Sequence, residues 1–255
     1  VKDAATLKDT TITTNPVIKN STSGVGLEAR SLPVLDLNGN ITIHSESQFG
    51  MIGSGYSSTD LNLNGYTLTK TGAGNFHMSS TVADKGTIRI EEGRVQIIER
   101  NANNKSDFTT TSFEVCNNSG VKGTLEVDVT CALGELVANG GTVEVNGATR
   151  VATVNKLTGS AFDKQGDGSL ALASGIQIAD DMDITVGGGS ITLAAIEVAE
   201  GKTLNIAGAV VAEGLTKTGA GALTIDALSG SISYVSLTNN ATIESLTGAT
   251  TLDFI

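Results

Sequence analysis

The 255-residue sequence predicts an all-β protein built as a parallel β-helix, an elongated solenoid of short stacked strands. Two observations carry this prediction: a heptapeptide that recurs unchanged, and the alternation of apolar with polar residues. Leu-Thr-Lys-Thr-Gly-Ala-Gly occupies positions 68–74 and again 215–221, which is 147 residues later. Because 147 divides into seven turns of about 21 residues, a plausible length for one coil, the repeat favours a stack of coils.

Apolar residues recur at every second position in short bursts along the whole chain. This period of two is typical of strands with one buried face. The clearest bursts are Leu125/Val127/Val129, Leu204/Ile206 and Leu223/Ile225. Between the bursts lie glycine-containing pairs, which tolerate the positive φ that sharp corners require.

Asn-Gly pairs leave a local alternative open. They occur at 38–39, 64–65, 139–140 and 146–147. Between alternating runs, Asn-Gly is also the strongest short signal for an antiparallel hairpin. The repeat favours the parallel solenoid for the chain as a whole, but single hairpins remain compatible with these pairs.

The chain reads as one continuous body, because no charged run or Pro-rich stretch divides it. Residues 41–255 are expected to form the β-helix, with repeat copies near 68–97 and 215–244. Residues 1–40 are less regular and contain Pro16 and Pro33. We expect this segment to be an N-terminal cap or an irregular start, since the end of a solenoid exposes unpaired strand edges.

Composition narrows the classes of partner. The formal net charge is −11 and the 16 basic residues form no cluster, which disfavours nucleic acid. No apolar stretch approaches the roughly 20 residues of a membrane-spanning helix, and the first residues lack a secretory signal pattern. With no Trp and only 9 Tyr and Phe, the core must be aliphatic. The last residues fall within an expected strand, which suggests an excised piece of a longer product.

The repeat copies resemble the autotransporter-associated β-strand repeat found in passenger regions of bacterial outer-membrane autotransporters. In the first copy the heptapeptide leads into 75–78 and continues through 85–90 to 95–97, and in the second it leads into 222–225. A third, degenerate copy begins near Gly166. The likeness covers about a third of the chain strongly, and the remaining residues share only its strand and turn texture.

This resemblance implies a single-stranded, right-handed parallel β-helix that is exported by a Gram-negative type of bacterium. It implies display at the cell surface or secretion, with outer-membrane attachment through a barrel that is absent from this chain. The expected role is a stalk or adhesin that binds a host or bacterial cell-surface protein or glycan. The repeat turns are Gly72, Gly74, Gly219 and Gly221. The resemblance implies no catalytic residue, metal or cofactor.

Cys116 and Cys131 are candidates for a disulfide. They enclose a short loop with a strand-like segment between them, a spacing that could join neighbouring coils. Closing such a loop would stabilise the fold by about 3 kcal/mol in an oxidising compartment. The alternative is a pair of buried thiols that act as small hydrophobic side chains.

Acidic clusters are the other candidates for chemistry. They are Asp163 with Asp167, Asp180 and Asp181 with Asp183, and Glu197 with Glu200. Their oxygens could bind calcium or serve a carbohydrate-active β-helix enzyme, a lyase or glycosidase, although no EF-hand loop is present. That enzyme reading rests on analogy of fold, and a chain without Trp is poorly supplied with sugar platforms. His44 and His77 lack partners at metal-ligand spacing, so we expect no enzyme activity.

Overall fold

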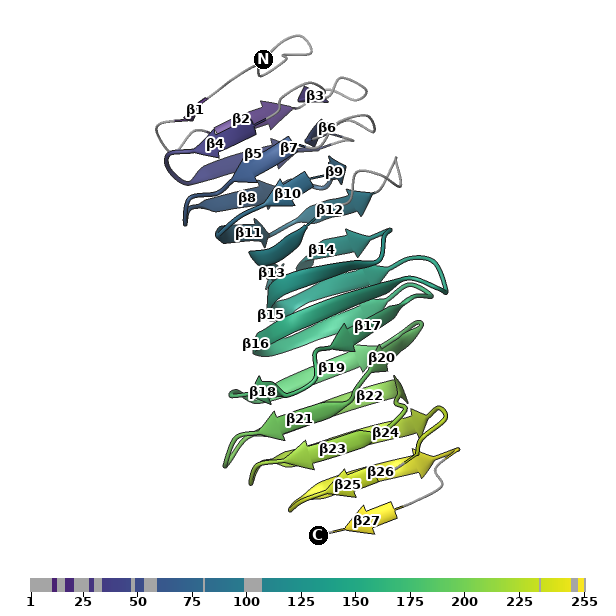
Figure 1. Ribbon diagram of the computed structural model, residues 1–255. Helices are drawn as coiled ribbons and strands as arrows, with labels where there is room; N and C mark the ends of the chain where they lie inside the picture. Colours follow the sequence, from purple (N-terminus) through teal and green to yellow (C-terminus); the bar gives the residue numbers. More distant parts are fainter. Residues whose placement is uncertain are drawn as a thin grey trace.

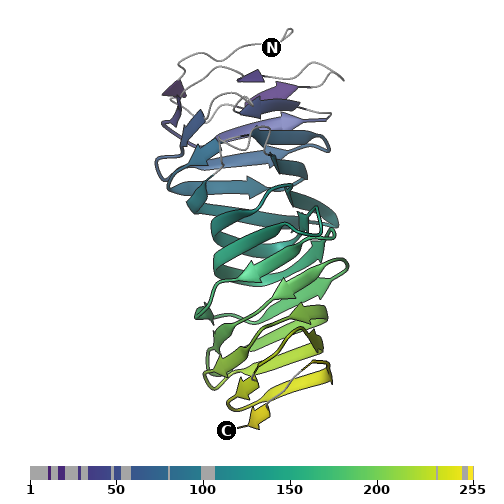
Figure 2. The same ribbon diagram turned by 45° about the vertical axis from the view of Figure 1, so that its right-hand side comes forward.

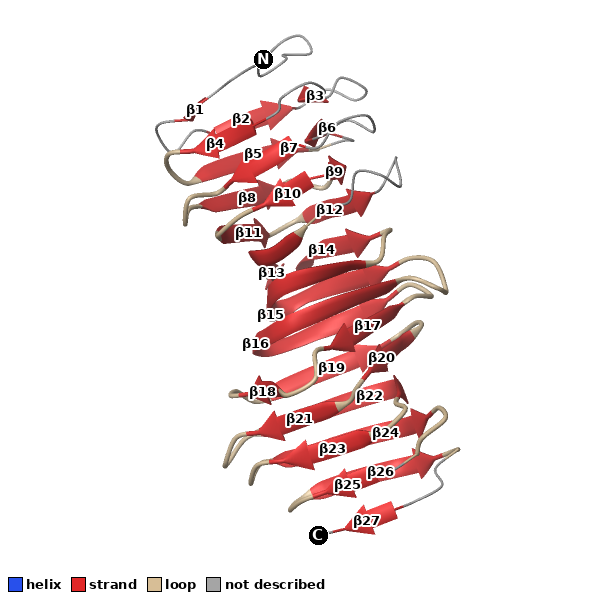
Figure 3. Cartoon of the chain, viewed as in Figure 1, coloured by secondary structure: helices blue, strands red, loops and turns tan. Residues whose placement is uncertain are grey.

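The computed structural model describes residues 11–12, 17–20, 28–29, 34–46, 49–52, 59–79, 81–98, 107–233, 235–248 and 252–254. In this part of the chain every regular element is a β-strand and nearly all strand pairs are parallel, which confirms the predicted all-β solenoid (Figure 3). The coils stack into a long body, with the low-numbered strands at one end and the high-numbered strands at the other (Figure 1). Across the described residues, there is no helix with the length and apolarity to span a bilayer.

Each coil visits three faces in turn. The first face contains β1 (Thr11–Ile12), β4 (Val34–Leu37), β7 (Thr59–Asn62), β10 (Thr81–Ala83), β17 (Ser169–Leu172) and β20 (Ser190–Thr192). The second contains β2 (Val17–Asn20), β5 (Ile41–Ser45), β8 (Thr67–Thr71), β11 (Gly86–Ile90), β18 (Ile176–Ile178), β21 (Ala195–Val198), β23 (Leu215–Thr218), β25 (Val235–Leu237) and β27 (Leu252–Phe254). The third contains β3 (Glu28–Ala29), β6 (Phe49–Ile52), β9 (Asn75–Ser79), β12 (Gly93–Ile98), β14 (Val121–Val127) and β19 (Met182–Val186).

Some strands continue around a corner and belong to more than one face. They are β13 (Phe108–Asn118), β15 (Cys131–Val145), β16 (Val151–Gln165), β22 (Thr203–Val211), β24 (Ala222–Ser229) and β26 (Ala241–Leu246). Such strands merge the faces, so hydrogen bonding joins the chain into sheets of 4, 18 and 5 strands. Figure 2, turned by 45°, shows the coils stacked one on another along the whole body.

The order of the strands places the two heptapeptide copies on the same face. Starting from the lysine of the first copy, successive partners on the second face are Lys70, Ile90, Val115, Ala138 and Gly159. The second face continues where β18 packs on β16, and from Ile176 the register passes through Ile196 to Lys217. The copies are therefore seven coils apart, which is the number that the sequence spacing of the heptapeptides predicts.

The core is a set of apolar columns that run along the solenoid axis. On the second face, Leu68, Ile88, Phe113, Leu136 and Leu157 stack in register and are all buried. Alternation supplies these columns, because inward positions are apolar on strand after strand. Each fully buried aliphatic side chain contributes roughly 1.5–3 kcal/mol, so the stack is stabilised mainly by contacts between neighbouring coils.

The Asn-Gly pairs form corners rather than hairpins where the structure describes them. Asn64 and Gly65 have φ of 53° and 81°, the signs that a two-residue hairpin loop also needs, yet they lead between faces of one coil. The antiparallel pairing in the described residues joins β13 to β14, around Ser119-Gly120 with φ of 56° and 92°. Both turns thus have two positive φ angles. The pairing of the strands on either side determines whether the turn is a corner or a hairpin.

Parallel pairing already begins within residues 1–40. The described residues there are 38–40 and the strands β1, β2, β3 and β4, which pair in parallel with the next coil. The rest of the segment that was expected to form a cap, including Pro16 and Pro33, lies outside the described residues.

Glycine is required at the corner of each heptapeptide for two different reasons. Gly72 and Gly219 have φ of +77° and +81°, a conformation that L side chains rarely adopt. Gly221 lacks positive φ, but a Cβ there would lie 2.2 Å from the carbonyl oxygen of Ala199 in the preceding coil. Gly74 donates its N–H to the Ser45 carbonyl at 2.7 Å and so ties its own coil to the one before it.

Replacing Gly219 with Ala should therefore damage the fold far more than replacing Gly201 with Ala. Both residues have positive φ, but a Cβ on Gly219 would lie 2.2 Å from the Val198 carbonyl oxygen, whereas a Cβ on Gly201 would meet nothing within 4 Å. We expect a loss of about 1–2 kcal/mol for Gly201→Ala and about 2–5 kcal/mol for Gly219→Ala in urea unfolding. Equal losses would show that the stacked carbonyl does not constrain this corner.

Candidate functional site on the third face

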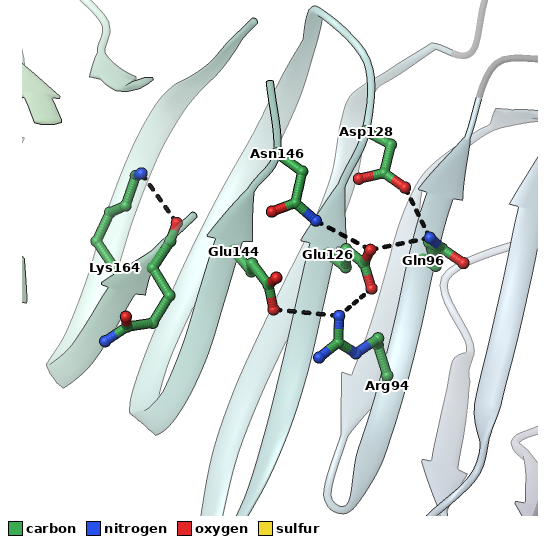
Figure 4. Close-up of polar contacts among 8 residues, drawn as sticks. Arg94, Gln96, Glu126, Asp128, Glu144, Asn146 and Lys164 are labelled. Atoms are coloured by element: carbon green, nitrogen blue, oxygen red, sulfur yellow. Dashed lines mark hydrogen bonds and ion pairs between the residues drawn. The ribbon is translucent and has the colours of Figure 1, made fainter. Parts of the chain in front are cut away.

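A group of polar side chains projects from three adjacent strands of the third face and forms a connected network (Figure 4). We call it the polar ladder, and its members are Arg94, Gln96, Glu126, Asp128, Glu144 and Asn146. They lie on β12, on or just after β14, and on or just after β15. Alternation sets their direction, because the intervening Val95, Leu125 and Val143 are buried in the core.

Strand register brings two carboxylates face to face. Gln96 pairs with Glu126, and Glu126 pairs with Glu144 on the next parallel strand. Neighbouring strands are about 4.8 Å apart, and like charges directly opposite each other are destabilising. Arg94 offsets this repulsion, since its Nη1 forms an ion pair with Glu126 and lies 3.1 Å from Glu144 Oε2. One guanidinium thus joins three strands.

Two amides satisfy the remaining oxygen of Glu126. Gln96 Nε2 donates to Glu126 Oε1 at 2.9 Å, and Asn146 Nδ2 donates to the same oxygen at 3.0 Å. Gln96 Nε2 also donates to Asp128 Oδ2 at 2.6 Å. The ladder is therefore a connected network in which both oxygens of the central carboxylate have partners.

Burial and charge act in opposite directions on the ladder. Burial raises the pKa of Glu126 above its ordinary value, because its side chain is only 9% exposed, and Arg94 only partly offsets that rise. Burial alone would lower the pKa of Arg94. The hydrogen bond to Glu126 and the negative charges of Glu126 and Glu144 outweigh burial, so the pKa of Arg94 is raised. Glu126 therefore binds a proton more readily than an ordinary glutamate does.

The ladder can do two kinds of chemistry. Its carboxylate and amide oxygens can accept hydrogen bonds from hydroxyl groups of a sugar, and a carboxyl with a raised pKa can donate a proton. The ladder is a flat array on a sheet. An open hollow of about 490 Å³ lies elsewhere, between the first and second faces, and is lined by Thr192, Leu193, Ala194, Val211, Ala212, Glu213, Gly214 and Ser233.

The structure bonds most members of the acidic clusters to neighbouring coils. Asp163 pairs with Lys122, and Asp167 accepts the N–H of Gly147 at 2.5 Å. In the second cluster, Asp180, Asp181 and Asp183 are exposed, with Asp181 accepting from the Thr203 N–H at 2.9 Å and Asp183 from Asn205 at 2.8 Å. In the third, Glu197 accepts from Gln177 at 3.0 Å. Throughout the described residues, no set of three or more His, Cys, Asp or Glu side chains could hold a metal ion.

The structure holds both cysteines as thiols without a bond between them. Cys116 lies opposite Asn139 and Gly140 of β15, whereas Cys131 begins that strand and lies opposite Ala152. The two are thus offset by eight positions along the ladder of strands, and a disulfide needs Cα atoms within about 7 Å. Burial raises the pKa of Cys116 to about 11, which suits an inert thiol in the core.

The two histidines lie on different faces. His44 is on β5, where Nδ1 lies 3.1 Å from Thr71 Oγ1 and Nε2 lies 2.7 Å from Glu46 Oε1. His77 is buried on β9 and pairs in register with Gln96 at the edge of the polar ladder. The register therefore places His77, and not His44, beside the ladder.

Sequence reasoning missed the polar ladder because its spacing is irregular. Arg94 and Glu126 are 32 positions apart, whereas Glu126 and Glu144 lie much closer together in the sequence. The signal that could have revealed these residues is a polar residue between two apolar ones in a strand. Gln96 lies between Val95 and Ile97, and Glu126 lies between Leu125 and Val127. The strand registers are needed to place these positions side by side.

Comparisons with protein-family models, with curated proteins and with solved structures found no match for this chain. Its function must therefore be inferred from its own residues. Two features carry that inference: the repeated corners inside the solenoid and the polar ladder on its third face.

Replacing Arg94 with Met should destabilise the protein by roughly 1–3 kcal/mol at pH 7, because Glu126 and Glu144 would face each other without a cation. The loss should shrink toward pH 4. Glu126 has a raised pKa, so it takes up a proton there and the repulsion disappears. Chemical unfolding at the two pH values measures the difference.

Lys122→Met is the matched control, since it removes a half-exposed surface pair with Asp163. We expect that variant to lose less than about 1 kcal/mol. An Arg94→Met loss of the same size at both pH values would contradict the role assigned to Arg94.

Proposed function

We propose that this protein is a surface-displayed or secreted bacterial passenger of the autotransporter type, whose β-helix acts as a stalk or adhesin. The observation that carries the proposal is the equivalence of the two heptapeptides. Lys70 and Lys217 lie seven coils apart on the second face, and each is followed by a glycine of positive φ at the corner that leads to the third face. The resemblance to autotransporter-associated repeats thus concerns residues with the same structural role, rather than a chance match of letters.

A stacked solenoid suits a stalk on physical grounds. Each coil pairs its backbone groups with the coils on either side, and its apolar columns continue from one coil to the next. Length can therefore be added coil by coil while the cross-section stays the same. Because most of the stability comes from inward and corner positions, most outward positions are available for binding.

The outward positions offer two kinds of surface to a cell-surface protein or glycan. Residues 165–255 contain ten Asp and Glu and two Lys, so they carry −8 of the total charge of −11. The first face is free of charged side chains at five stacked outward positions, four of them in the same region: Thr153, Ala171, Thr192, Val211 and Ser229. An uncharged face within an acidic body suits a partner that approaches by hydrogen bonding, such as a neutral glycan.

Antibodies raised against this chain should label intact cells of the source bacterium or detect the chain in cell-free medium. External protease should remove the label from intact cells while a periplasmic marker stays protected. Labelling that requires permeabilised cells would contradict surface display. The same antibodies should block adhesion of the cells to their partner surface if the chain is an adhesin.

A second candidate function, cleavage of a polysaccharide, is favoured by the polar ladder alone. A buried carboxyl with a raised pKa beside other carboxyl groups is the arrangement that glycoside hydrolysis uses for its general acid. The ladder suits this chemistry better than Asp180, Asp181 and Asp183, which are exposed. Because the ladder is a flat array and the hollow lies elsewhere on the solenoid, the stalk is the leading proposal.

If the ladder is catalytic, the protein should release reducing or unsaturated ends from at least one member of a broad polysaccharide panel. Glu126→Gln should then lower the rate by at least about 100-fold, in line with the loss of a general acid. Glu244→Gln, a change at an exposed outward position, is the control and should keep full activity. Absence of turnover across the panel would contradict this second candidate.

A further inference from the structure

Three lysines are completely buried at corners of the solenoid. They are Lys70, Lys164 and Lys217, each with a relative exposure of 0%. All three share the pattern Lys-x-Gly-x-Gly, which appears in the two heptapeptides and in the degenerate third copy at 164–168. Lys70 and Lys217 occupy corners between the second and third faces, whereas Lys164 occupies a corner between the third and first faces.

Main-chain carbonyl oxygens surround each buried ammonium group. Lys164 Nζ lies 2.9 Å from the oxygen of Gln165, 3.0 Å from that of Gly166, 2.5 Å from that of Gly168 and 2.9 Å from that of Gly188 (Figure 4 shows Lys164 with one of its contacts). The first three oxygens belong to its own corner, and Gly188 belongs to the next coil. One cation therefore ties two coils together.

The other two corners repeat this arrangement. Lys217 Nζ lies 2.9 Å from the Gly219 oxygen, 2.5 Å from the Gly221 oxygen and 2.7 Å from the Thr238 oxygen. Lys70 Nζ lies 2.8 Å and 2.6 Å from the oxygens of Thr71 and Gly72, and 3.3 Å from that of Glu92 in the next coil. In every case the acceptors come from the corner and from the coil stacked on it.

The number of oxygens around Lys164 shows what kind of site this is. An ammonium group has three N–H donors, whereas four carbonyl oxygens lie within 3.0 Å of Nζ. The oxygens thus surround the charge in the way that carbonyl rings surround a dehydrated potassium ion. Burial lowers the pKa of Lys164 to about 8, so the group remains a cation at pH 7.

We propose that each Lys-x-Gly-x-Gly corner is a carbonyl cage for a monovalent cation, filled in the native protein by the ammonium group of its own lysine. When that ammonium group is removed, the cage should bind a free cation of similar size, potassium or ammonium. This inference concerns the interior of the solenoid and is independent of the proposed function. It assigns one physical role to a sequence motif that occurs three times in the chain.

Lys164→Met tests the cage, because Met fills the space of the lysine stem and leaves the position of Nζ vacant. We expect its thermal unfolding midpoint to be higher in potassium chloride than in choline chloride of equal ionic strength, by about 5 °C at saturating potassium. The native protein should show the same midpoint in both salts. Lys156→Met removes a lysine that is 64% exposed, and it should behave like the native protein.

Lys217→Met repeats the test at a second corner that has three oxygens rather than four. Equal midpoints in the two salts for both buried-lysine variants would overturn the proposal. So would potassium dependence of the same size in Lys156→Met, because it would reveal a salt effect unrelated to the cages.

A measurement on the native protein does not depend on whether the variants fold. Proton and nitrogen NMR at pH 7 should detect ammonium signals from Lys70, Lys164 and Lys217 that exchange slowly with water, since each group is enclosed by carbonyl oxygens. Exposed lysines such as Lys156 exchange too fast to be seen. Rapid exchange at all three buried lysines would contradict the cage.

Discussion

Register between successive coils is the constraint on which the rest of this structure depends. Adjacent parallel strands lie about 4.8 Å apart, so each corner must turn the chain while another corner lies directly above it. A Cβ that points along the axis then collides with a carbonyl of the neighbouring coil, as it would at Gly219 and Gly221. Carbonyl oxygens that point inward at the same corners need a partner, because an unpaired buried polar group is costly. In the heptapeptide, glycine avoids the collision at the corner and lysine pairs with the inward carbonyl oxygens.

The general fold could be predicted from sequence because its signals are local and repeated. Alternation of apolar residues defines the strands, and the spacing of the heptapeptides defines the number of coils between Lys70 and Lys217. Asn-Gly pairs could not be assigned in the same way. Asn64-Gly65 at a corner and Ser119-Gly120 in a hairpin both have two positive φ angles, so the turn residues alone do not reveal whether the next strand is parallel or antiparallel.

Contacts between side chains on different coils could not be predicted, because coil length varies. Gly93 pairs with Gly123, a long step along the sequence, whereas Thr124 pairs with Thr142 after a much shorter one. Because the steps are so unequal, the mean coil length cannot predict which outward residues lie side by side. The choice between a disulfide and two thiols was left open for this reason, since the interval between Cys116 and Cys131 matches neither step and Cys116 comes to lie opposite Asn139. The polar ladder was missed for the same reason.

The position of the polar ladder bears on its role. It connects β12, β14 and β15. The step in sequence from β12 to its partner β14 is the longest between paired strands, and the step from β14 to β15 is one of the shortest. The hairpin at Ser119-Gly120 also interrupts the regular coil there. A long step leaves more chain to order, so an added cross-strand link is most useful there. Arg94 supplies such a link by joining Glu126 and Glu144 on two successive strands. The ladder is thus explained as a brace for an irregular part of the solenoid without any reaction, and this physical reason ranks the stalk above the enzyme.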